Sequence, residues 1–219
     1  MAQVDPTTHR LIRSREERLN TLTHGLGVVA SVAACAVLIT FTALHGNVWQ
    51  VVGACVFSAA LILMYLASTV YHGALSPKAK ARLEILDHCA IYVLIAGTYT
   101  PFTLVTIHGP WGWSLFGVVW GLAVLGIGFK IFFTGRFELI STLLYLAMGW
   151  LIVVAIQPLM QAMSGWGLFW LVAGGLAYTM GTYFFLNKRL PYAHFIWHLF
   201  VLMGSSFHFV AVWSQVVPG

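Results

Sequence analysis

The chain has 219 residues, of which 60% are hydrophobic and only 8% are charged, with eleven Lys and Arg against six Asp and Glu. Soluble domains usually carry about 25% charged residues, because their surfaces face water. The composition therefore excludes an ordinary soluble enzyme, a disordered tail and a nucleic-acid-binding protein, whose bases would be numerous and clustered. An integral membrane protein is the class that remains.

Seven apolar runs are each long enough to cross a bilayer, which takes about 20 apolar residues in a helix. The runs are continuous rather than alternating, which disfavours a β-barrel. We therefore expect an all-α membrane protein, a bundle of seven transmembrane helices at residues 22–44, 50–72, 86–107, 113–133, 139–157, 167–186 and 192–214. This division leaves an N-terminal segment at 1–21, a membrane domain at 22–214 and a short tail at 215–219.

The positions of the bases predict how the bundle is oriented. All eleven lie before the first run, or in or beside the connections that follow the second, fourth and sixth runs. Lys and Arg are enriched on the cytoplasmic side of membrane proteins. We therefore expect the N-terminus in the cytoplasm and the C-terminus outside.

Ionisable side chains inside the membrane are costly, so they are candidates for functional residues. The predicted topology places His72 at the cytoplasmic end of the second span and Asp87 at the start of the third. It places His194 and His198 in the first two turns of the seventh span. Spans that are far apart in sequence thus bring polar groups to one depth, which predicts a single site near the cytoplasmic face.

The spacing of these residues favours a metal site. His194 and His198 are one turn apart on one face of a helix, and His72 offers a third nitrogen from another helix. Three protein nitrogens and one water form the open tetrahedral arrangement typical of catalytic zinc. Asp87 is then expected to act as a general base, and Ser68, one turn before His72, to hold a substrate oxygen or to contact a ligand.

Each residue also has a simpler interpretation. A His-x-x-x-His pair occurs by chance on many helices, and single buried histidines commonly form hydrogen bonds between helices. Asp87 also suits the N-terminus of a helix or an ion pair with Arg82, and Ser68 suits a hydrogen bond to its own backbone. The convergence of the whole set at one depth favours metal binding over these separate roles.

Three further histidines are assigned other roles. His88 points about 100° away from Asp87 around the helix that carries both residues, so we do not expect His88 to be a ligand. His208 lies about 21 Å along its helix from His194, which is too far to share one metal ion. We expect His208 to form a packing hydrogen bond with a neighbouring helix. His24 shares a helical stripe with Glu17 and Asn20, which predicts hydrogen bonds between helices, with a role as fourth ligand as the alternative.

Five motifs, in this order, resemble those of the bacterial hemolysin III family, a branch of the progesterone and adipoQ receptor superfamily. The adiponectin receptors and alkaline ceramidases of that superfamily share the Ser-x-x-x-His, Asp and His-x-x-x-His layout. The motifs cover nearly the whole chain and are Glu17-x-x-Asn20-x-x-x-His24, Ser68 to His72, Asp87 to Tyr92, Gly97 to Phe102, and His194 to His198.

The resemblance implies a seven-helix bundle with Zn²⁺ bound by His72, His194 and His198, and with Asp87 and Ser68 beside the ion. In those relatives the zinc lies on the cytoplasmic side, and the assigned chemistry is hydrolysis of a lipid amide such as ceramide. The family name also implies lysis or pore formation, although no amphipathic pore-lining stripe is evident in the sequence.

Our first hypothesis is a zinc-dependent hydrolase of a lipid-like amide or ester, in a bacterial inner membrane. The substrate is expected to enter from the lipid, with its acyl chain between helices and with Tyr92 and Tyr99 on the cavity wall. One alternative is a sensor of membrane state in which zinc is structural, and another is a pore-forming lysin. Membrane lipids are the expected partners, with no nucleic acid and no obligate protein partner.

Overall fold

The computed structural model describes residues 6–217, and these form a bundle of helices without a strand. The expected N-terminal segment and C-terminal tail also include residues 1–5 and 218–219, which lie outside the described range. Within that range, seven helical segments are long and apolar enough to cross a membrane. The predicted all-α seven-span architecture is confirmed, while the side of the membrane that each terminus faces stays a prediction.

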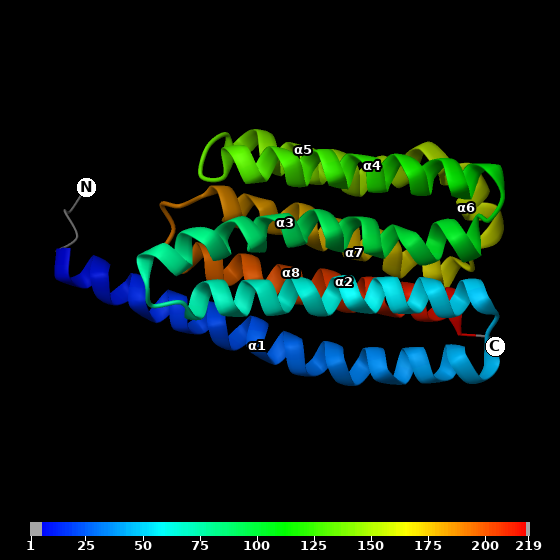
Figure 1. The fold of residues 1–219 in the computed structure, drawn as a ribbon, viewed down its shortest axis with the longest axis horizontal. Coiled ribbons are helices and arrows are strands. Elements are labelled where there is room, and N and C mark those ends of the chain that lie inside the picture. Colours follow the sequence, from blue (N-terminus) through cyan, green and yellow to red (C-terminus); the bar gives the residue numbers. More distant parts are fainter. Residues whose placement is uncertain (1–5, 218–219) are drawn as a thin grey trace.

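The helices run side by side along the long axis of the molecule (Figure 1). The third span consists of α3 and a π-helical turn, η1, and the fifth consists of α5, a 3₁₀ turn, η2, and α6. The elements are α1 (Pro6–His45), α2 (Val48–Gly73), α3 (Pro77–Pro101), η1 (Phe102–Thr106), α4 (Pro110–Phe133), α5 (Glu138–Trp150), η2 (Leu151–Ala155), α6 (Ile156–Ala162), α7 (Gly165–Leu186) and α8 (Ala193–Val216).

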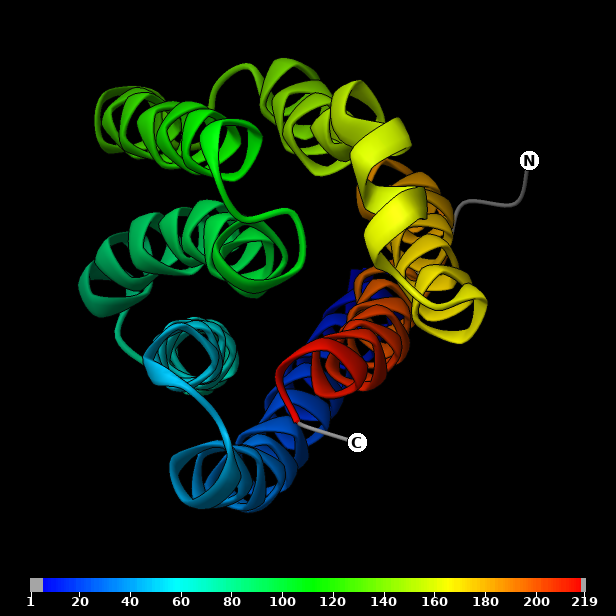
Figure 2. The ribbon, with the colours of Figure 1, turned by 90° about the vertical axis from the view of Figure 1, so that its right-hand side faces the viewer.

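The connections that carry the bases lie together at one end of the bundle. These are the α2–α3, α4–α5 and α7–α8 connections, and α1 also begins at this end, on the left in Figure 1. We call this the basic end. Viewed along the helices, α4 lies on the outside beyond α3, whereas α3, α5, α7 and α8 face one another across the interior (Figure 2).

The fifth span is broken, whereas the sequence predicts one continuous helix over 139–157. The α-helix stops at Trp150 and the chain continues as a 3₁₀ turn. The hydroxyl group of Tyr99, on α3, lies at the break: its oxygen is 2.8 Å from the carbonyl oxygen of Gly149 and accepts the N–H of Ile152 at 2.7 Å. A side chain from another helix thus satisfies backbone groups that lipid cannot satisfy.

Small residues bring α2 and α3 into close contact. A Cβ atom added to Gly97 would lie 2.4 Å from the Cβ of Ala60, and one added to Gly53 would lie 3.0 Å from the Cα of Pro101. Small residues at such interfaces are common in membranes, because attraction between helices there depends on close packing rather than on exclusion of water. On the outer face, Phe132 of α4 is 79% exposed, as expected for a surface in contact with lipid.

We expect Gly97→Ala to destabilise the bundle by about 1–3 kcal/mol, because neither the Ala60 Cβ nor the α2 backbone can move aside easily. Thermal unfolding in detergent would measure the change. The matched control is Gly128→Ala on α4, where an added Cβ meets nothing within 4 Å. Equal melting temperatures for the two variants would contradict the predicted tight contact.

Candidate metal centre

Three histidines meet at the basic end. His72 lies in the last turn of α2, and His194 and His198 lie in the first two turns of α8. One possible ligand atom of each lies within 4.8 Å of those of the other two, and His72 and His198 are buried. The structure therefore brings together the three residues chosen from the sequence, and together they could bind a metal ion.

The geometry of the cluster fits an ion held by nitrogen atoms. The ring centre of His72 lies 5.0 Å from that of His194 and 4.8 Å from that of His198, and the other two ring centres are 4.9 Å apart. The three rings thus form a nearly equilateral triangle. The Nε2 atom of His72 is buried and has no hydrogen-bond partner among the described residues. Such an atom is costly to bury without a partner, and a bound cation would satisfy it.

The other nitrogen of His72 is occupied. Its Nδ1 atom lies 2.9 Å from Oε2 of Glu17 on α1, and the side-chain nitrogen of Asn20 lies 3.5 Å away. These contacts confirm that the stripe formed by Glu17 and Asn20 makes hydrogen bonds between helices. A histidine that donates one N–H to a carboxylate presents its second nitrogen for a metal, an arrangement found in many metal sites.

His24 belongs to the same stripe but does not make the expected hydrogen bond. Both of its ring nitrogens lack a partner among the described residues. Its ring stacks on that of His198, with centres 3.6 Å apart, and packs edge-on against Tyr65. Aromatic contacts therefore hold this side chain, and it lies outside the group of three candidate ligands.

The other two histidines that the sequence assigned to separate roles, His88 and His208, lie outside the group of three candidate ligands. His88 is not in the group of candidate ligands, as its direction on the helix predicts. His208 lies with its Nε2 atom 3.1 Å from the carbonyl oxygen of Leu171 on α7, which confirms the expected packing hydrogen bond.

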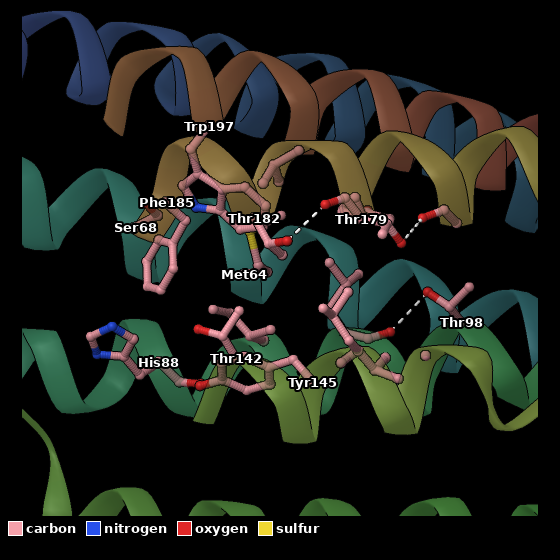
Figure 3. Close-up of a pocket in the computed structure, with 18 of the residues that line it drawn as sticks. Met64, Ser68, His88, Thr98, Thr142, Tyr145, Thr179, Thr182, Phe185 and Trp197 are labelled. Carbon is pink, nitrogen blue, oxygen red and sulfur yellow. Dashed lines mark hydrogen bonds between the residues drawn. The ribbon is translucent and has the colours of Figure 1, made fainter. Parts of the chain in front are cut away.

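A cavity opens beside the histidines, between α3 and α5 on one side and α7 and α8 on the other (Figure 3). Its empty space, counted together with the open mouth, is about 1080 Å³. His194 and His198 lie on its wall, and most of the other lining side chains are apolar or aromatic. The candidate metal site thus faces a space suited to an apolar ligand.

Asp87 and Ser68 lie on the wall of the same cavity. The carboxyl group of Asp87 is not among the candidate ligand atoms. Among the residues that the structure describes, Asp87 forms no ion pair with Arg82 or any other base. The catalytic roles assigned to these two residues stay predictions.

A second cavity of about 570 Å³ continues the first toward η2 and α6, and the two share several lining residues, Tyr99 and Trp150 among them. Tyr99 thus lies on the cavity wall as expected. Tyr92 is not among the described residues that line either cavity, so its expected place is wrong. Its ring packs instead against Tyr145 and over Gly126, which has no side chain to block it.

The family model described as "Haemolysin-III related" matches residues 12–209. The chain belongs to this family. It is 49% identical over 204 residues to Hemolysin-3 of Bacillus cereus, with 93% of each chain covered. It is 48% identical over 198 residues to the Hemolysin-3 homolog of Bacillus subtilis (strain 168), with 90% of this chain and 93% of that chain covered.

A more distant relative is the human monocyte to macrophage differentiation factor, which is 27% identical over 209 residues and covers 92% of this chain and 84% of its own. The match to the haemolysin III family includes all five motifs and every candidate site residue. This family and the seven apolar helices together identify the chain as a multi-pass membrane protein.

We expect purified protein to hold about one metal ion per chain and His72→Ala to hold almost none, because two nitrogens from one helix bind far more weakly than three. Mass spectrometry of metals after metal-free handling would measure both. His208→Gln is the matched control, since it also replaces a buried histidine, outside the cluster. Retention of the ion by His72→Ala, or equal loss in the control, would contradict the assignment.

Proposed function

We propose that this protein is a zinc-dependent hydrolase of a lipid-like amide or ester, with its site at the basic end of the bundle. One observation carries the proposal: two members of a cluster of three histidines line a mostly apolar cavity whose wall also holds an acid and a hydroxyl group. Three imidazole nitrogens suit zinc among the common divalent metals. From the distribution of bases, we place this end in the cytoplasm and the protein in the bacterial cell membrane.

Zinc, when bound, would supply Lewis-acid chemistry, polarising a carbonyl group and making water a better nucleophile near neutral pH. His72, His194 and His198 would hold the ion. A site with three protein ligands keeps a further position for water or substrate, which distinguishes catalytic from structural zinc sites.

The two other polar residues have complementary roles in this proposal. The Asp87 carboxylate takes a proton from the attacking water and returns it to the leaving group. The Ser68 hydroxyl donates a hydrogen bond to the oxygen on which negative charge develops. Because Asp87 and Ser68 both lie on the wall of the same cavity, both can serve the same carbonyl group.

The length and apolar character of the two connected cavities support a substrate with a hydrocarbon chain. Each methylene group transferred from water to an apolar environment contributes about 0.8 kcal/mol of favourable transfer free energy. A lipid that enters from the bilayer gains less binding free energy, because its hydrocarbon chain is already out of water. We therefore propose that the hydrocarbon chain of the substrate packs against the cavity wall and that its polar linkage binds at the histidines.

A sensor with structural zinc is the second candidate function. Its support is that the three nitrogens come from two helices, so a bound ion would join the end of α2 to the start of α8. Such a protein would bind zinc and show no turnover.

We expect Asp87→Asn to lower the rate of hydrolysis about 10²- to 10⁴-fold, the usual contribution of a general base, while the zinc content is unchanged. Release of fatty acid from a fluorescent N-acylsphingosine and from a fatty acyl ester would measure it. Glu84→Gln is the control, because Glu84 is on the same helix but does not line the cavity. Zinc-loaded wild type that hydrolyses neither probe would favour the sensor.

We expect Ser68→Ala to lower kcat about 10²- to 10³-fold and to change KM little, since the hydroxyl group would act on charge that develops in the transition state. Hydrolysis of the same fluorescent N-acylsphingosine and fatty acyl ester would measure kcat and KM. Thr69→Ala on the next position of α2 is the control, because its hydroxyl group donates to the carbonyl oxygen of Tyr65 at 2.7 Å. A rise in KM alone would assign Ser68 to substrate binding instead.

A further inference from the structure

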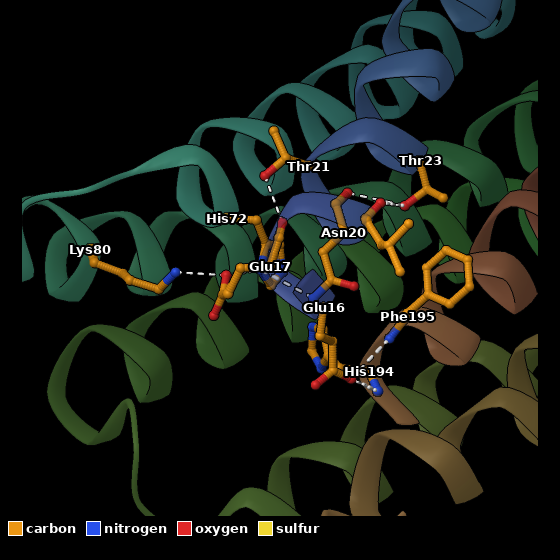
Figure 4. Close-up of polar contacts among 10 residues, drawn as sticks. Glu16, Glu17, Asn20, Thr21, Thr23, His72, Lys80, His194 and Phe195 are labelled. Carbon is orange, nitrogen blue, oxygen red and sulfur yellow. Dashed lines mark hydrogen bonds and ion pairs between the residues drawn. The ribbon is translucent and has the colours of Figure 1, made fainter. Parts of the chain in front are cut away.

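Two adjacent glutamates of α1 contact the two helices that carry the candidate metal ligands. Successive residues of an α-helix point about 100° apart, so neighbours can reach different helices. Glu17 contacts His72 of α2, and Glu16 contacts the start of α8 (Figure 4). The first helix offers none of the three candidate ligands, yet it touches both parts of the site.

Glu17 is held in place by two donors. Its Oε2 atom lies 2.9 Å from Nδ1 of His72 and 2.7 Å from Nζ of Lys80, in the first turn of α3. The ammonium group of Lys80 also lies 5.0 Å from the ring centre of Tyr71. The carboxylate is thus fixed between α2 and α3, and it can keep the imidazole in the tautomer and rotation that leave Nε2 for a metal.

Glu16 replaces a cap that α8 does not supply itself. The residue before the helix, Tyr192, has left-handed backbone geometry (φ 58°), and its side chain forms no capping hydrogen bond. Oε1 of Glu16 instead accepts the backbone N–H groups of His194 at 2.9 Å and Phe195 at 3.4 Å. A negative charge at a helix N-terminus is favourable, because free N–H groups point toward it. This contact fixes the backbone of the turn that carries His194.

We propose that Glu16 and Glu17 are positioning residues for the metal centre: Glu17 orients the imidazole of His72, and Glu16 anchors the first turn of α8, which carries His194 and precedes the turn of His198. The inference rests on the metal-binding part of the proposed function. Through these two contacts, α1 sets how tightly the site holds zinc. Removal of such a supporting partner typically weakens metal binding about 10- to 100-fold.

The first experiment titrates Zn²⁺ into full-length protein in detergent, against a competing chelator, for wild type and Glu17→Gln. We expect a 10- to 100-fold weaker affinity in the variant, because a neutral amide polarises the imidazole less. Glu138→Gln is the matched control, since this glutamate is also paired with a lysine, Lys188, but contacts no candidate ligand. Its affinity should equal that of wild type.

A second measurement separates positioning from general support of the fold. The absorption bands of Co²⁺ in the site report the geometry of its ligands, and we expect Glu17→Gln to change them. The melting temperature of the metal-free variant should remain close to that of metal-free wild type. Lys80→Met tests the same idea without altering the carboxylate, and we expect a smaller loss of affinity in the same direction.

Glu16→Ala tests the second contact. We expect weaker Zn²⁺ binding and faster hydrogen exchange at the amides of His194 and Phe195, because both lose their acceptor. The matched control is Ser164→Ala, which removes the cap of α7, where the Ser164 hydroxyl accepts the N–H of Gly167 at 3.2 Å. That helix carries no candidate ligand, so its variant should bind zinc as wild type does.

The outcomes distinguish the two proposals. Wild type that binds no zinc would overturn both the proposed function and this inference. Wild type that binds zinc, with unchanged affinity and unchanged Co²⁺ spectra in Glu17→Gln and Glu16→Ala, would overturn this inference alone.

Discussion

Hydrocarbon offers no hydrogen-bond partner, so every polar group of a membrane-spanning chain has to find one within the protein. This constraint explains the helices, whose backbone groups are paired within each segment, and also the places where regular structure stops. At the break in the fifth span, the hydroxyl group of Tyr99 serves the exposed backbone. At the start of α8, the carboxylate of Glu16 does so. The Nε2 atom of His72 is one of several buried side-chain atoms without a partner, and it belongs to the group of three candidate metal ligands.

The ends of the helices are where this chemistry is concentrated. His72 lies in the last turn of α2, His194 in the first turn of α8, and Lys80 in the first turn of α3. Charged and polar side chains are less costly near the boundary of a membrane than at its centre, so the basic end can hold several of them. Beside it, the interior holds two cavities with mostly apolar walls. This separation of a polar end from an apolar cavity is the physical reason for proposing a substrate in which a polar linkage is attached to a hydrocarbon chain.

Much of the site could be predicted because depth in a membrane follows from sequence. The apolar runs define the spans, and the bases define which ends lie together, so His72 and the pair on α8 were expected at one level. The close approach of their nitrogens agrees with that expectation. The depth of a residue in the membrane does not specify the direction in which its side chain points around the helix. For this reason Tyr92 was expected on the cavity wall and instead packs against Tyr145. For the same reason, His24 was expected to form hydrogen bonds and instead stacks on His198.

The sequence by itself determined the class of protein, the seven spans and the identity of the three histidines, because hydrophobic length, charge bias and i, i+4 spacing are local properties of the chain. Only the tertiary structure decided which contacts support those histidines. Glu16 lies in the polar segment before the first apolar run, where nothing local distinguishes it from a solvated acid. The stripe with Asn20 and His24 predicted that Glu17 forms hydrogen bonds between helices, but the sequence did not specify its partner. The roles of both glutamates depend on how α1 packs against α2 and α8, and that packing depends on residues more than 50 positions away.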